Sequence, residues 1–230
     1  MAVGSELLFS HDRCLGRRFV CGADEAGRAA WAGPLVTAAV RLDYTRLEPV
    51  SDAVKRLQYL NDSKRVSDRR RAMLLSAIFD LADEVAIVAV SAAKIDSGGG
   101  VEVWNMRALA RALEAVAHPE SVNLVDWYEI QAVDGWNGEV LPQRVEGGDR
   151  VSAAIAAASI VAKETRDQLM RGLDLECPGY GFAAHKGYGG GTGEHEATIR
   201  TKGVLSPAHR LSIYPKVYAE IGLPPPDRRV

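Results

Sequence analysis

Four acidic residues stand where apolar segments of the sequence end or a helical pattern is about to begin. They are Asp24, Glu25, Asp126 and Asp149. In α/β sheets, groups that carry chemistry tend to lie at strand ends, where a rigid backbone fixes the side chains and loops admit a substrate. Carboxylates that converge in a partly buried pocket repel one another, and a hard cation such as Mg²⁺, which prefers oxygen ligands, relieves that repulsion. Two such ions about 4 Å apart can activate a water molecule and stabilise the leaving oxygen of a phosphodiester.

The same acids also fit a simpler role. For one Asp at a strand end, a turn-capping or solvated role is favoured by roughly four to one over a metal-binding role. Asp134 in the nearby AVDGWNG segment competes with Asp126, although its surroundings are more typical of a turn. Adjacent acids point to opposite faces of a strand, so Asp24 and Glu25 reach one site only if the strand ends there, which Gly27 favours. The residues alone indicate a metal-dependent hydrolase and leave the simpler role open.

Hydrophobic patterns predict the elements that would hold these acids in place. Short runs rich in apolar and β-branched residues predict strands at 19–23, 33–42, 85–90 and 121–125. Helical spacing predicts helices at 67–82, 101–117 and 152–171, with shorter ones at 194–202 and 207–221. The small residues of 152–171 would let that helix lie close against a sheet. We expect the first two strands to pair, and an α/β fold with a mixed sheet flanked by helices.

Length and composition predict how the chain is organised. With 230 residues, 47% of them hydrophobic, the chain can bury one substantial core with a small annex. We expect an N-terminal extension at 1–17, a catalytic domain at 18–171, and a small helical C-terminal subdomain at 172–230. No apolar run is long enough to cross a membrane and no signal peptide is recognisable, so we expect a cytoplasmic protein without membrane contact. The three widely spaced cysteines predict neither disulfides nor a zinc site.

The overall charge does not by itself suggest a nucleic-acid-binding protein. The formal net charge is −2, whereas many proteins that bind nucleic acids are visibly basic. The run KRVSDRRR at 64–71 is a local exception. It fits a basic patch beside a metal site, and a solvated helix face explains it equally well.

Five further segments form an ordered set between about residues 18 and 218. They read GADEAGRAAWAGPLVTAAV at 22–40, LNDSKRVSDRRR at 60–71, NLVDW at 123–127, EGGDRVSAAIAAASIVAKETRD at 146–167, and GYGFAAHKGYGGGTGEH at 179–195 followed by SPAHRLS at 206–212. Together they resemble the ribonuclease HII family, the type 2 ribonucleases H. An ordered set of this kind is far more specific than any one segment.

The resemblance implies a ribonuclease H-like fold and a metal-dependent endoribonuclease. It implies that Asp24, Glu25, Asp126 and Asp149 bind metal and catalyse, with Mg²⁺ or Mn²⁺ as the cofactor and two ions during catalysis. The implied substrates are RNA–DNA hybrids and duplex DNA with embedded ribonucleotides, as in ribonucleotide excision repair. The family cuts on the 5′ side of the ribonucleotide and leaves a 3′-hydroxyl and a 5′-phosphate. We expect a monomer.

The resemblance also implies a set of substrate-binding residues. They are Gly27, Arg28, Ala29, Lys64, Lys186, Tyr188 and Arg210. The backbone of residues 27–29 would read the ribose 2′-hydroxyl, the group that distinguishes RNA from DNA. Tyr188 would stack near the RNA–DNA junction and bond the same hydroxyl, unless it is only a loop aromatic. The three cations Lys64, Lys186 and Arg210 would hold phosphates.

Two positions depart from the family pattern. Ala29 stands where the family has the third residue of a Gly-Arg-Gly loop. A positive φ at Ala29 would cost roughly 1 kcal/mol and tilt the amide, whereas a negative φ would leave the amide donor unchanged. Gly147 stands where the family has a lysine, so one cation near the fourth acid is missing. These changes leave two alternatives open, namely another metal-dependent nuclease of related fold and a hybrid-binding protein with weak or no catalysis.

Three other patterns receive structural interpretations. His185 and His195 have no further ligand at zinc spacing, so we expect a phosphate contact or loop packing. The glycine-rich stretch 187–193 lacks the pattern of a nucleotide-binding P-loop. Lys163, Arg166 and Asp167 are interpreted as charges on the surface of a helix.

Overall fold

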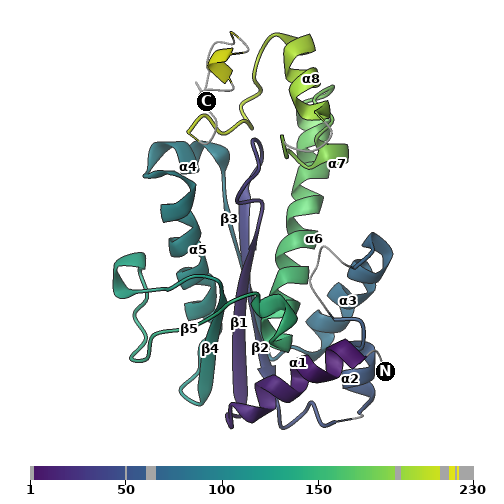
Figure 1. Cartoon of the computed structure of the whole chain (residues 1–230), viewed down its shortest axis with the longest axis vertical. Coiled ribbons are helices and arrows are strands. Elements are labelled where there is room, and N and C mark those ends of the chain that lie inside the picture. The colour runs from purple at the N-terminus through teal and green to yellow at the C-terminus, as the bar shows by residue number, and fades with distance from the viewer. Residues whose placement is uncertain are drawn as a thin grey trace. The chain divides into compact units, whose positions relative to one another are not determined.

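The chain folds around a five-stranded sheet, as a computed structural model shows for residues 3–49, 51–60, 66–189, 193–212, 218–220 and 222. The strands follow the order β3-β2-β1-β4-β5 across the sheet (Figure 1). Their bounds are β1 (Phe19–Ala26), β2 (Leu35–Asp43), β3 (Glu84–Val90), β4 (Ser121–Asp126) and β5 (Gln143–Val145). The expected pairing of the first two strands is confirmed, and β1 lies at the centre of the sheet.

Helices precede, connect and follow these strands. The α-helices are α1 (Val3–Cys14), α2 (Asp52–Arg56), α3 (Asp68–Leu81), α4 (Ala92–Ser97), α5 (Gly100–Val116), α6 (Ala153–Glu176), α7 (Phe182–His185) and α8 (Glu194–Lys202). Two short 3₁₀ turns are η1 (Ala132–Asp134) and η2 (Gly148–Arg150). The predicted α/β class with a mixed sheet is therefore confirmed.

The central strands run parallel where they carry the first acids. β1 pairs with β4 from Phe19 opposite Ser121 to Ala23 opposite Val125. β4 in turn pairs in parallel with β5. Because the carboxyl ends of parallel neighbours lie at the same edge of a sheet, the residues that follow Ala23 and Val125 are brought together.

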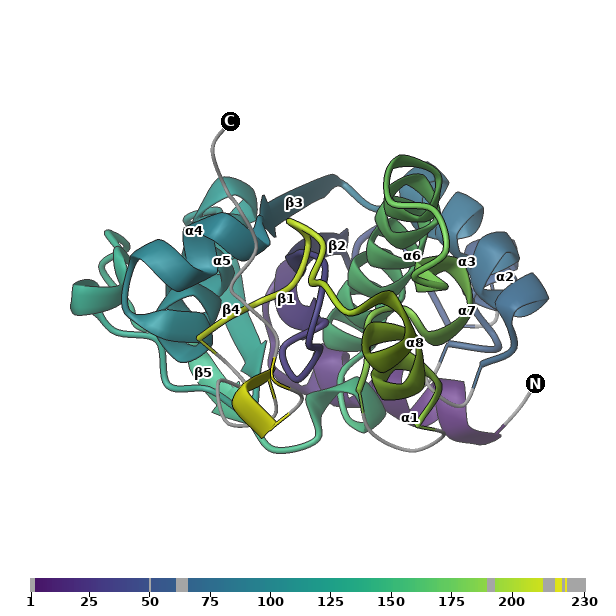
Figure 2. The ribbon, with the colours of Figure 1, turned by 90° about the horizontal axis from the view of Figure 1, so that it is seen from above.

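Alternate residues of β1 belong to two hydrophobic clusters, one on each face of the sheet. Val20 packs into a cluster that includes buried side chains of α1, α3 and α6. Cys21 and Ala23 pack into a second cluster with α5. Figures 1 and 2 show α5 on one side of β1 and α6 on the other. Both faces are covered, which explains why β1 reads as a continuous apolar run rather than an alternating one.

Gly22 allows α6 to lie against the backbone of β1. A Cβ atom at this position would stand 2.2 Å from the Ile155 nitrogen and 2.3 Å from the Ala154 carbonyl carbon. The residues from Ala153 to Ala158 are completely buried. The expectation that the small residues of this helix pack closely on the sheet is confirmed.

The chain divides into two compact units. The first comprises residues 1–26, 37–88 and 106–164, and the second comprises 27–36, 89–105 and 165–230. The four acids lie in the first unit, and the loop at 27–34 lies in the second. The domain boundaries expected at 17 and 171 stay a prediction. Within the described residues, no helix has both the length and the apolar character needed to cross a membrane.

Most predicted elements are present with shifted ends, and the prediction of a helix at 207–221 is wrong over residues 207–212, whereas residues 218–220 are helical. The helix expected at 207–221 is not formed at 207–212, where the chain makes turns and an isolated bridge between His209 and Ala32. Residues 206 and 208–210 are instead buried, and hydrogen bonds join this segment to the 27–34 loop, such as the one from the Gly33 amide to the Ala208 carbonyl. These tertiary bonds compete successfully with local helix formation.

Candidate active site

Asp24 and Asp126 each stand one residue beyond the pair of Ala23 and Val125 in the β1–β4 register. Asp24 is buried, whereas Glu25 and Asp126 are partly exposed. After Asp126 the strand ends abruptly, because Trp127 takes a left-handed conformation with φ of 64° and donates its amide to the Val145 carbonyl. Such a conformation is uncommon for a bulky residue and is typical of functional sites.

The charges around Asp24 show that the first three acids converge. The pKa of Asp24 is raised well above its usual range, chiefly by burial and then by the negative charges of Glu25 and Asp126. Hydrogen bonds donated by the Ser159 hydroxyl and by the Glu25 amide oppose this rise. Three carboxylates are therefore close enough to repel one another across a partly buried site.

Asp149 is linked to Asp126 through its neighbour Gly148. The Gly148 amide donates to Asp126 Oδ1 at 2.6 Å, and a Cβ at Gly148 would stand 2.5 Å from the Ile155 Cδ1 atom. Asp149 lies on η2 with a side chain that is 15% exposed. Gly147 has φ of 61°, a conformation that favours glycine over the lysine of the family pattern.

These carboxylates suit a hard divalent cation. They supply only oxygen donors, and burial together with the negative charges of Glu25 and Asp126 raises the pKa of Asp24. Within the described ranges, no three His, Cys, Asp or Glu side chains stand close enough to enclose a metal ion as they are.

Two buried arginines, both in the second unit, donate hydrogen bonds to backbone carbonyls of the loop at 27–34. Arg210 donates from Nη1 to the carbonyls of Gly27 (2.6 Å) and Arg28 (3.1 Å), and from Nε to the Gly33 carbonyl (2.8 Å). Arg166 donates from Nε to the Pro34 carbonyl (2.9 Å) and from Nη2 to the Ala32 carbonyl (3.1 Å). Both side chains are fully buried.

The placement of Arg166 corrects a prediction. Arg166 and Asp167 are 0% and 2% exposed and are not surface charges. Burial lowers the pKa of the Arg166 guanidinium, and burial together with the Arg166 charge lowers that of Arg210. The burial of Arg210 and its bonds to loop carbonyls indicate that it shapes the loop, and the phosphate contact expected for it stays a prediction.

Tyr188 lies against the same scaffold. The Arg166 guanidinium carbon is 4.9 Å from the centre of the Tyr188 ring, which is a cation–π distance. The Gly187 carbonyl accepts the amides of Trp31 (2.8 Å) and Ala32, which joins this segment to the 27–34 loop. Lys186 has φ of 52° and donates from Nζ to the Ala183 carbonyl. The structure thus brings the expected loop and tyrosine into one substructure.

Ala29 is not strained. Among the described non-glycine residues only Trp127 and Lys186 have positive φ, so alanine needs no left-handed conformation at position 29. Arg28 and Ala29 are exposed, and the Arg28 side chain reaches Glu102 Oε1 at 3.0 Å. Of the two alternatives given for Ala29, the one without a positive φ applies, in which the amide donor is unchanged. Lys64, the remaining expected residue, lies outside the described residues.

The sequence analysis did not identify the role of Ser159 and assigned a different role to Arg166. Ser159 bonds Asp24, and Arg166 supports the loop. They are seven residues apart on α6, so they share one face of the helix. Both residues lie on the face of the Ala-rich helix that packs inward. Polar residues that recur on such a face are the sequence signal that could have revealed both roles.

The histidines noted in the sequence form a packed cluster. The His185 and His195 rings stack at 4.2 Å, and His195 Nε2 lies 3.1 Å from His209 Nε2. Burial is the largest cause that lowers the pKa of His195 to about 3 and that of His209 to about 4. Both rings are neutral at physiological pH, which favours packing over phosphate contact for His195.

Comparison with known proteins gives a consistent result. The family model described as ribonuclease HII matches residues 21–214. A ribonuclease HII from Salinispora tropica is 41% identical over 96% of this chain and 78% of its own length. One from Roseiflexus castenholzii is 41% identical over 94% of this chain and 92% of its own length.

Solved structures agree on the fold. Ribonuclease H2 from Pyrococcus horikoshii OT3 has a TM-score of 0.70 at 22% identity, covering 89% of this chain and 99% of that one. A ribonuclease HIII solved in complex with Mn²⁺ has a TM-score of 0.57 at 20% identity, covering 72% of this chain and 57% of that one. This chain therefore belongs to the ribonuclease HII family, a membership that supports hydrolysis of the RNA strand of RNA–DNA hybrids.

Proposed function

We propose that this protein is a metal-dependent endoribonuclease that also cuts duplex DNA on the 5′ side of an embedded ribonucleotide, leaving a 3′-hydroxyl and a 5′-phosphate. The observation that carries the proposal is the convergence of Asp24, Glu25 and Asp126 at the ends of two parallel strands. Asp149 would complete the set, and the bond from the amide of its neighbour Gly148 to Asp126 supports this. The expected monomeric state and cytoplasmic location remain predictions.

The four acids would bind and orient divalent cations. When bound, two Mg²⁺ or Mn²⁺ ions would supply activation of a water molecule and stabilisation of the leaving oxygen. The Ser159 hydroxyl and the Glu25 amide orient the Asp24 carboxylate, and the Gly148 amide orients that of Asp126. These bonds fix the ligand oxygens before substrate arrives.

The loop at 27–29 would read the 2′-hydroxyl through its amides. In a trans peptide the N–H points opposite to the carbonyl of the preceding residue, and the described chain has no cis peptide. Because the Gly27 and Arg28 carbonyls point at the buried Arg210, the amides of Arg28 and Ala29 are directed away from it. This orientation supports the proposed donors, and Tyr188 would stack beside them.

One assay tests the proposal. The protein is incubated with Mg²⁺ or Mn²⁺ and end-labelled DNA duplexes that contain one ribonucleotide or none. We expect a single cut on the 5′ side of the ribonucleotide, a product that a DNA polymerase can extend, and no cut in the all-DNA duplex. Cleavage of both duplexes would contradict 2′-hydroxyl reading, and cleavage of neither, with a cut hybrid as positive control, would contradict incision at single ribonucleotides.

A further inference from the structure

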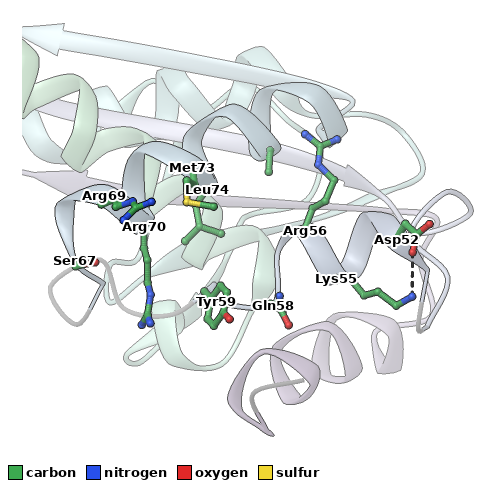
Figure 3. Close-up of a pocket in the computed structure, with 11 residues that line it drawn as sticks. Asp52, Lys55, Arg56, Gln58, Tyr59, Ser67, Arg69, Arg70, Met73 and Leu74 are labelled. Carbon is green, nitrogen blue, oxygen red and sulfur yellow. Dashed lines mark hydrogen bonds and ion pairs between the residues drawn. The ribbon is translucent and has the colours of Figure 1, made fainter.

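A cavity of about 630 Å³ lies between α2 and α3 in the first unit. None of its lining residues belongs to the acid set or to the 27–34 loop. Figure 3 shows Tyr59 and Gln58, from the segment that follows α2, between Arg70 of α3 and Lys55 of α2. The cavity is large enough for a ligand of nucleotide size, since small-molecule sites span about 300–1,000 Å³.

The walls of the cavity are strongly cationic. Four of the lining side chains are Lys55, Arg56, Arg69 and Arg70, and Asp52 is the single acid among the lining residues that the structure describes. This imbalance contrasts with the net charge of −2 for the whole chain. Part of the basic run at 64–71, namely Arg69 and Arg70, therefore lines a concave surface.

Two of these arginines have no acidic partner within the described part of the chain. Lys55 pairs with Asp52 at 3.0 Å, and Arg56 pairs with Asp80. Among the described residues, no ion pair involves Arg69 or Arg70. Their positive charges are thus not neutralised from within this part of the chain.

Arg71, the next residue of the same run, has a different role. Its side chain is buried and lies 2.6 Å from both Glu164 and Asp68. This pairing uses the one acid inside the DRRR segment. The structure therefore divides the run into a structural arginine, Arg71, and two arginines that face the cavity.

Apolar and aromatic surface accompanies the charge. Tyr59 is 45% exposed and Met73 is 64% exposed, and Leu74 and Ala77 also line the cavity. The Arg70 guanidinium carbon lies 4.9 Å from the centre of the Tyr59 ring. A planar ring could stack on this platform, because bases stack on aromatic rings and on guanidinium planes.

We propose that this cavity binds a nucleotide unit, with its phosphate on Arg69 and Arg70 and its base against Tyr59 and Met73. Arginine donates bidentate hydrogen bonds to phosphate. A base would cover the apolar surface of the cavity, whereas inorganic phosphate alone would leave that surface exposed to water. An acidic peptide would satisfy the charges but would not use an aromatic platform. The nucleotide can be a free nucleoside phosphate or part of a single strand, and the site goes beyond the proposed cleavage.

Binding is measured in EDTA, so that cleavage plays no part. The probes are ADP, a short labelled deoxythymidine strand, a blunt DNA duplex and an oligoglutamate peptide. The variants are the double substitution Arg69→Gln/Arg70→Gln and the single substitution Tyr59→Leu. Arg111→Gln is the matched control, because Arg111 is an exposed arginine of α5 with a side chain that is 78% exposed. Thermal unfolding of each variant checks that it folds.

We expect ADP or the single strand to bind the wild type and the control equally. The arginine pair variant should weaken that binding at least about tenfold and lower its salt dependence, and Tyr59→Leu should weaken it as well. ADP binding assigns the site to free nucleotides, and binding of the strand alone assigns it to a nucleic-acid segment. Equal binding by the wild type and the variants, or a preference for oligoglutamate over ADP and the single strand, would overturn the proposal. Because no metal or cleavage is involved, these outcomes are independent of the nuclease assay.

Discussion

Replacement of Gly27 by alanine should disturb the loop that is proposed to read the 2′-hydroxyl. Gly27 has φ of 86°, and an added Cβ would stand 1.9 Å from the Arg166 Nε atom. Arg166 can yield only by giving up its bonds to the Pro34 and Ala32 carbonyls. The strained φ costs roughly 1 kcal/mol, and each lost charged hydrogen bond costs about 1.5–3 kcal/mol. With both bonds lost, we expect about 4–7 kcal/mol of destabilisation in total.

Gly100→Ala is the matched control for the conformational part of this cost. Gly100 has φ of 83°, but an added Cβ meets nothing within 4 Å. Urea unfolding should therefore show only about 1 kcal/mol of destabilisation for this variant. Cleavage of a single-ribonucleotide duplex should fall more steeply in Gly27→Ala than cleavage of an RNA–DNA hybrid. If Gly27→Ala destabilises no more than Gly100→Ala, Arg166 is not the fixed support described here.

Three further predictions concern the acids, the loop and the histidines. Asp24→Asn should abolish cleavage, while hybrid binding, measured by gel shift, should persist. If cleavage survives, the assignment of Asp24 as a metal ligand is refuted. Ala29→Gly should leave the ratio of ribonucleotide to all-DNA cleavage within about twofold, because position 29 needs no positive φ; a clear rise would mean that the alanine hinders the loop. The folded pKa values of His195 and His209, about 3 and about 4, lie below the ordinary 6.5, so their contribution to stability is fully present above pH 6.5 and is lost as pH falls toward 4. Each should add a slope of up to about 1.4 kcal/mol per pH unit in urea unfolding, and a His209→Gln variant with an unchanged slope would refute this.

The elements that sequence patterns predicted well are those with strong local signals. α3 begins after Ser67 as expected, and α8 occupies the predicted residues 194–202. In contrast, α6 continues five residues beyond the expected end at Arg171, to Glu176. Nothing local stops it there, because Gly172 is tolerated inside a helix at modest cost.

The sequence motifs indicate candidate site residues but not the residues that support them. The ordered motifs placed the acids, but convergence depends on the parallel register of β1 and β4, which is a long-range property. Arg166 was misassigned because helical spacing gives the face of a residue without saying what covers that face. The turn at Trp127 had no sequence signal, since tryptophan is not typical of left-handed backbone.

The contact at Gly22 has a consequence for motion during turnover. The backbones of β1 and α6 meet there without an intervening side chain, two residues from Asp24 and in the helix that carries Ser159. The amide hydrogens of such a strand exchange with solvent only when a large part of the fold opens. We therefore expect deuterium uptake in β1 to be among the slowest in the chain. The packing of β1 on α6 that positions Asp24 would then stay intact from one catalytic cycle to the next.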